Sequence, residues 1–124
     1  MGHERQMTSP EAIEVVERVR RICGGLPETE EIVDGFGHTV FKVRGKTFIM
    51  LGESEQYGVN LSFKSDRENQ ELLVQQEGFF RTPYIGQHGW VSVRNPQNWD
   101  ALEDLLKEAY LRAAPKRLVK QYWS

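Results

Sequence analysis

The stretch HTVFKVRGKTFIML, residues 38–51, contains two runs rich in β-branched and aromatic residues on either side of Gly45. Such runs separated by a glycine are typical of two antiparallel strands joined by a tight turn. We therefore predict a β-hairpin with strands over residues 38–44 and 46–51 and a basic tip. This hairpin makes an antiparallel sheet the expected centre of the fold.

Further strands are expected on both sides of the hairpin. Residues 58–64 (GVNLSFK) and residues 90–94 (WVSVR) alternate between apolar and polar side chains, the pattern of a strand with one buried face. Residues 30–33 could add a strand at the edge of the sheet. Short connections between these segments favour antiparallel pairing.

Three helices are expected around the strands. The first begins at Thr8-Ser9-Pro10-Glu11, where a capping hydroxyl precedes proline and an acid, and it ends at Gly24-Gly25. Ser65 and Glu68 have the spacing of a capping box and predict a second helix that ends near residue 77. Asn98 is expected to cap a third helix with an apolar stripe, which Pro115 ends before a last short helix. The expected fold is a two-layer α+β domain with the helices on one face of the sheet.

Length and composition are those of one globular domain. The chain has 124 residues, a formal net charge of −2 and a single cysteine, so we treat residues 1–124 as one domain without an internal disulfide. No apolar run approaches the ~20 residues that cross a bilayer. The first residues lack the apolar core of a secretory signal. We expect a cytoplasmic protein without a membrane partner.

The sequence offers little catalytic or cofactor chemistry. His3, His38, His88 and Cys23 have none of the compact spacings of a metal site. Cys23 falls on the apolar stripe at the carboxyl end of the first helix, where the helix dipole disfavours a thiolate. We predict no enzymatic activity, no catalytic residue, no metal and no cofactor.

One surface pattern points to binding. In the alternating strands the less apolar side chains should face away from the helices. This set includes Asn60, Ser62 and Ser92, and four basic residues with no acid: Lys42, Arg44, Lys64 and Arg94. Trp90 shares the phase of Ser92, and Tyr84 is near it in sequence. Basic residues interleaved with aromatic ones suit phosphate contacts and base stacking.

The order of several short motifs resembles the MmcQ/YjbR family. The motifs are Leu26-Pro27 with Glu31, residues 38–48 (HTVFKVRGKTF), Asn60-Leu61 with Lys64, residues 71–73 (ELL), Pro83-Tyr84, and residues 89–93 (GWVSV). The resemblance implies an α-β(3)-α-β(2)-α domain, similar to secretion-chaperone and CyaY-like folds. It also implies DNA binding through a proposed double-wing arrangement, with Lys42, Arg44 and Lys46 in the first wing. The segment from Tyr84 to Trp90 would form the second element. This chain has Thr39 where many relatives have proline. Many relatives also have a longer basic loop before the tryptophan, whereas residues 85–89 carry no permanent charge.

Three functions follow as hypotheses. The first is a DNA- or RNA-binding domain that uses Lys42, Arg44, Lys46, Lys64 and Arg94 on phosphates and Tyr84 or Trp90 for stacking. The second is a protein-interaction or chaperone-like module, as a homodimer or with a peptide partner at an edge strand. The third is a small-molecule or enzymatic pocket near His38, Tyr84 and His88.

Overall fold

The predicted hairpin is the centre of the sheet. In the computed structural model, which describes residues 8–35 and 37–124, strands β2 (Thr39–Val43) and β3 (Lys46–Ser54) pair antiparallel. Arg44 and Gly45 connect them with backbone φ angles of 49° and 81°. Two consecutive positive φ angles are those of a type I′ turn, whose twist matches the twist of the flanking strands.

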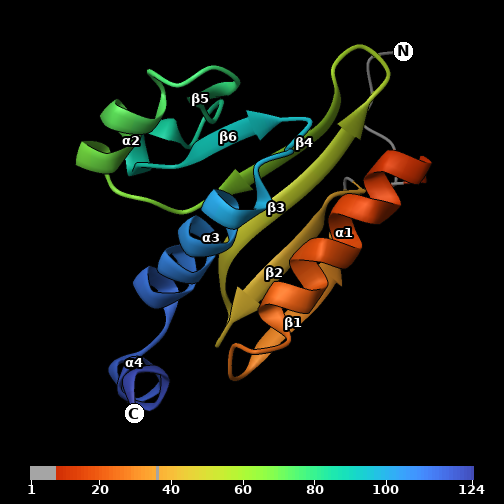
Figure 1. The fold of residues 1–124 in the computed structure, drawn as a ribbon. Helices are drawn as coiled ribbons and strands as arrows, with labels where there is room; N and C mark the ends of the chain where they lie inside the picture. Colours follow the sequence, from red (N-terminus) through yellow and green to blue (C-terminus); the bar gives the residue numbers. More distant parts are fainter. Residues whose placement is uncertain (1–7, 36) are drawn as a thin grey trace.

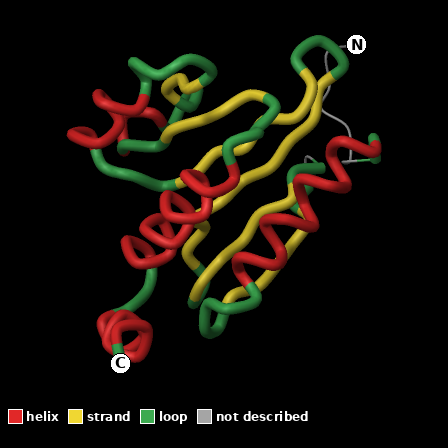
Figure 2. Tube along the Cα trace, viewed as in Figure 1, coloured by secondary structure: helices red, strands yellow, loops and turns green. Residues whose placement is uncertain are grey.

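The remaining elements complete a two-layer arrangement (Figures 1 and 2). The helices are α1 (Pro10–Cys23), α2 (Arg67–Leu73), α3 (Trp99–Ala113) and α4 (Lys116–Trp123), with a short 3-10 turn η1 (Gly86–His88). The other strands are β1 (Thr29–Val33), β4 (Gly58–Phe63), β5 (Phe79–Arg81) and β6 (Val91–Arg94). The expected α+β class is confirmed. The edge strand β1 and the last helix α4 add to the α-β(3)-α-β(2)-α scheme.

All six strands form one antiparallel sheet in the order β1-β2-β3-β4-β6-β5. Helices α1 and α3 lie side by side on one face, as Figure 1 shows. We call the opposite side the open face. Because residues paired across strands share a face, the open face carries these side chains: Ile32, Val40, Lys42, Met50, Asn60, Ser62, Phe80, Ser92 and Arg94.

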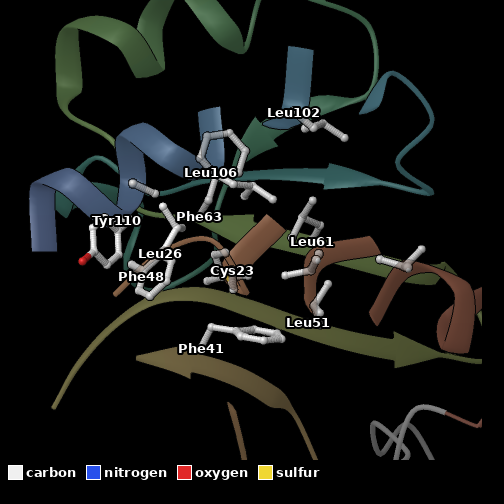
Figure 3. Packing of buried hydrophobic residues seen from close by; sticks show 14 of the residues in the cluster. Cys23, Leu26, Phe41, Phe48, Leu51, Leu61, Phe63, Leu102, Leu106 and Tyr110 are labelled. Carbon is white, nitrogen blue, oxygen red and sulfur yellow. The ribbon is translucent and has the colours of Figure 1, made fainter. Parts of the chain in front are cut away.

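A bulge in β3 strengthens the core between the sheet and α3. The pairing shifts between Phe41 and Lys42, so that Phe48 and Ile49 are consecutive in sequence and both fully buried. The Phe48 ring meets the edge of Tyr110, with 5.6 Å between ring centres. Tyr110 donates its hydroxyl proton to the carbonyl of Pro27 at 2.8 Å. Figure 3 shows these rings beside Leu26 and Cys23.

Two of the expected helix starts are confirmed and one is wrong. Ser9 and Asn98 cap α1 and α3 as predicted, each accepting a backbone N–H three residues ahead. Helix α2, however, is capped by Asp66, whose carboxylate accepts from the N–H of Asn69 at 2.7 Å. A carboxylate is a stronger acceptor than the Ser65 hydroxyl at the positive end of a helix. The helix also ends at Leu73, before the predicted residue 77.

Gly89 gives a test of how the loop before β6 is held. It has a φ of 91°, and a Cβ at this position would lie 2.7 Å from the Ser65 carbonyl oxygen and 2.8 Å from the Asp66 Cα. We expect Gly89→Ala to lower the free energy of unfolding by about 3 kcal/mol, through backbone strain and this clash. Urea unfolding followed by circular dichroism measures the change.

Gly25→Ala is the matched control, because a Cβ there would meet only the Ile22 carbonyl oxygen at 3.8 Å. Its effect should stay within about 0.5 kcal/mol. Equal stability of the two variants would contradict the packing described for Gly89.

Candidate functional site

The open face contains a groove of about 760 Å³ over its central strands. Met50, Ser62, Ser92 and Phe80 face one another across β3, β4, β6 and β5, and all four line the groove. Its volume lies within the ~300–1,000 Å³ common for ligand sites. The predicted placement of Ser62 and Ser92 on one face is confirmed by their pairing in the sheet.

Arg94 supplies the positive charge of the groove. Its guanidinium carbon lies 4.3 Å from the ring centre of Tyr57 and 5.0 Å from that of Phe80. Two aromatic faces hold the planar guanidinium by cation–π contact. In the described part of the chain no carboxylate lies within 4.0 Å of it. The N–H donors of Arg94 therefore remain available to an anion such as phosphate or carboxylate.

Three buried hydroxyl groups form a chain along the groove. The Ser92 Oγ lies 2.6 Å from the Ser62 Oγ and 2.8 Å from the Thr82 Oγ1. Three hydroxyls have three protons, whereas these contacts make two hydrogen bonds. Close by, Asn60 Oδ1 is buried with no hydrogen-bond partner among the described residues. Such an atom costs about 1–3 kcal/mol, so this part of the sheet has hydrogen-bonding capacity beyond what the fold uses.

The rim of the groove joins two segments that are distant in sequence. His38 lies at one side, where its Nδ1 is 3.2 Å from the Asp34 carboxylate. Tyr84 lies at another side, with 95% of its surface exposed and a φ of 68°. A positive φ is uncommon for tyrosine and costs of order 1–3 kcal/mol. The Tyr84 side chain extends into solvent from this turn at the rim of the groove.

The predicted basic residues divide into two groups. Lys42 is paired with Thr47 of β3. Arg94 is paired with Asn60 of β4, which in turn is paired with Gly52 of β3. The two positions are five residues apart along the strands, about 17 Å, and three strands apart across the sheet, about 14 Å, so that about 22 Å separates them. Lys64, whose N–H bonds the Phe48 carbonyl, follows β4 at the Lys42 end. We call Lys42, on the open face, and Lys64, just beyond the paired residues of β4, the basic end.

Neighbouring carboxylates offset two of the expected positive charges, those of Arg44 and Lys42. Arg44 lies in the turn, 3.7 Å from Glu28, which also binds Arg117 at 3.0 Å. The hydrogen bond from Arg117 lowers the pKa of Glu28, so this carboxylate stays ionised beside Arg44. Glu30 of β1 is directly opposite Lys42 on the open face. The expectation of four positive charges and no negative one on this face is therefore wrong. Lys46, at the other side of the turn, is exposed.

The predicted surface position of Trp90 is also corrected. Only 7% of its surface is exposed, so its ring offers little area for stacking. Gln70 of α2 donates its Nε2 protons to the carbonyls of Gly86 and Trp90, at 2.7 and 2.9 Å. These bonds hold the loop against α2. His88 is exposed on η1 and does not line the groove, unlike His38 and Tyr84.

Sequence reasoning missed four contributors to the site. Tyr57 and Phe80 come from a turn and an edge strand, and nothing in their local pattern links them to Arg94. Gln70 lies in a short polar helix, where a buried glutamine gives no periodic signal. Thr82 follows β5 and reaches Ser92 only through the pairing of β5 with β6.

The described residues contain no assembled metal site or membrane-spanning helix. Across residues 8–35 and 37–124, no three side chains of His, Cys, Asp or Glu converge on a possible metal position. His3, considered above as a ligand, lies outside these residues. No helix in the same part of the chain has both the length and the apolar character needed to cross a bilayer.

The sequence model of the YjbR family matches residues 24–112. The chain belongs to the YjbR family. This confirms the resemblance drawn from its motifs. Among solved structures, it is similar to the Deinococcus radiodurans protein DR2400, which has a DUF419 domain, with 25% sequence identity and a TM-score of 0.70. The alignment covers 86% of each chain. No curated protein matches this chain.

The reactivity of Cys23 in this YjbR-family chain can be tested directly. Its side chain is 3% exposed, and burial raises the pKa of the thiol to about 12. The thiol should therefore stay protonated at pH 8 and react with iodoacetamide far more slowly in the folded protein than in urea. Mass spectrometry of the alkylated product measures both rates. Equal rates would show that Cys23 is accessible and would reopen its role as a nucleophile.

Proposed function

We propose that this YjbR-family chain is a non-enzymatic nucleic-acid-binding domain whose contact surface is the open face of the sheet. The observation that supports the proposal best is the combination on one uncovered face of a basic end, an arginine without an acidic partner and an aromatic-lined groove. Lys42 and Lys64 would bind phosphates at one end, and Arg94 would do so about 22 Å from Lys42. A surface of this kind follows a chain of phosphates and does not depend on one base sequence.

The distribution of ion pairs supports this choice of face. Arg20 binds Glu31 on the helix-covered side of the sheet. Arg112 binds Asp66 at the end of the sheet. Arg20 lowers the pKa of Glu31, and the Asn69 backbone N–H together with Arg112 lowers the pKa of Asp66, so the charges of each pair compensate each other at neutral pH. Lys42, Lys64 and Arg94 have no such pair among the described residues. Their charge is free to attract a polyanion, although Glu30 reduces it near Lys42.

Salt-dependent binding tests the basic end. We expect the chain to bind labelled DNA or RNA at ~50 mM salt and to lose affinity steeply as salt rises. Lys42→Gln and Lys64→Gln should each reduce the slope of log K against log salt by about 0.7 to 0.9, the value for one phosphate contact. Fluorescence anisotropy over a salt series gives these slopes.

Arg21→Gln is the matched control. Arg21 is exposed on α1, which covers the other face of the sheet, so its loss should leave the slope unchanged. No binding to either nucleic acid at low salt, or the same slope for all three variants, would argue against the proposal.

A second candidate function is self-association through the sheet edge. Strand β1 is the last strand of the sheet, and Ile32 and Val33 are 38% and 50% exposed. An edge strand can pair with the same strand of a second copy. If it does, the wild-type protein should be a dimer in light scattering after size-exclusion chromatography. Val33→Lys should make it monomeric without changing its circular dichroism spectrum. A wild-type monomer at the highest soluble concentration would exclude this function.

A further inference from the structure

We propose that the groove binds one unpaired nucleotide, with its phosphate on Arg94 and its base between Phe80 and Tyr84. This inference rests on the proposed function and narrows it to single-stranded nucleic acid. It adds a second kind of contact to the phosphate contacts of the basic end. The nucleotide site lies apart from the turn residues Arg44 and Lys46.

The position of Arg94 favours a phosphate next to an aromatic body. Tyr57 and Phe80 hold the guanidinium within cation–π distance, which restricts its orientation and limits the side-chain entropy lost on binding. Its planar set of N–H groups matches two oxygens of a phosphate. Phe80 also lines the groove, so a base beside that phosphate would meet an aromatic surface at once.

The polar groups of the groove favour a body with hydrogen-bonding edges over a plain hydrocarbon. The hydroxyl chain of Ser62, Ser92 and Thr82 has one proton more than its two internal bonds use. A carbonyl oxygen or ring nitrogen of a base could accept that proton. A purely apolar ligand would leave it unpaired at a cost of about 1–3 kcal/mol.

Tyr84 adds the stacking surface. Its ring is almost fully exposed, at 95%, and it stands at the rim of the same groove as Arg94. Aromatic side chains stack on the flat face of any base, and each such contact is worth about 1–3 kcal/mol. Its backbone φ of 68° is a strained conformation for tyrosine, of the kind that clusters at binding sites.

These contacts require a base that is not paired. In a duplex the bases stack on one another, and a base reaches a protein pocket only after it flips out, which costs a few kcal/mol. The groove is concave and opens on the sheet face, so a single strand can place a base in it at no such cost. We therefore expect stronger binding of single strands than of duplexes.

The experiment compares one short DNA oligonucleotide as a single strand and as a duplex. Anisotropy should show tighter binding of the single strand by the wild-type chain. Tyr84→Asn should weaken single-strand binding about tenfold and leave duplex binding unchanged, since about 1.4 kcal/mol of stacking corresponds to that factor. Asparagine tolerates a positive φ, so the turn keeps its conformation. Arg94→Gln should lower single-strand affinity by a similar factor.

Titration with adenosine monophosphate, followed by NMR, locates the site. We expect amide shifts at Ser92 and Arg94 that inorganic phosphate alone does not reproduce. Identical shifts with phosphate alone, or an unchanged ratio of single-strand to duplex affinity in Tyr84→Asn and Arg94→Gln, would overturn the nucleotide site.

The two proposals fail in different ways. If Lys42→Gln reduces the salt slope but the groove variants change nothing, the proposed function stands and the nucleotide site is wrong. If neither strand form binds while adenosine monophosphate still shifts Ser92 and Arg94, the site stands as a nucleotide pocket and the nucleic-acid function is wrong.

Discussion

The fold and its groove both depend on the alternation of side chains along β4. This strand lies between β3 and β6 in the sheet, so both neighbours must match its register. Leu61 and Phe63 point to the helices and are fully buried, while Asn60 and Ser62 point to the open face. A shift by one residue would exchange these two sets. The apolar core thus places Ser62 opposite Ser92, and Asn60 opposite Arg94.

The open face combines two environments that a flat charged surface would not provide. At its basic end, the half-buried Lys42 lies beside Glu30, and salt screens the charges of both. In the groove, the exposed guanidinium of Arg94 lies against two aromatic rings, which restrict its orientation toward an anion. The first environment suits long-range attraction and the second suits a specific contact. This division is why the proposed function concerns both ends of the face.

The loop between β5 and β6 connects the site to the rest of the molecule. Gln70 binds two of its carbonyls, and Gly89 lets the chain pass close to Ser65 and Asp66. Asp66 in turn caps α2 and binds Arg112 of α3 at 2.9 Å. The turn that carries Tyr84 is therefore held by α2 and, through Asp66, by α3.

Local sequence patterns determined much of this protein. The β2–β3 hairpin, the Ser9 and Asn98 caps, the apolar stripe of α3 and the common face of Ser62, Ser92 and Arg94 all follow from neighbours a few residues apart. Only the tertiary structure decided which side chains meet from distant segments. Strand pairing brought Phe80 and Tyr57 to Arg94. It also placed Glu30 beside Lys42. Trp90 is buried where its loop packs against α2. These outcomes depend on register and strand order, which alternation along a single strand does not specify.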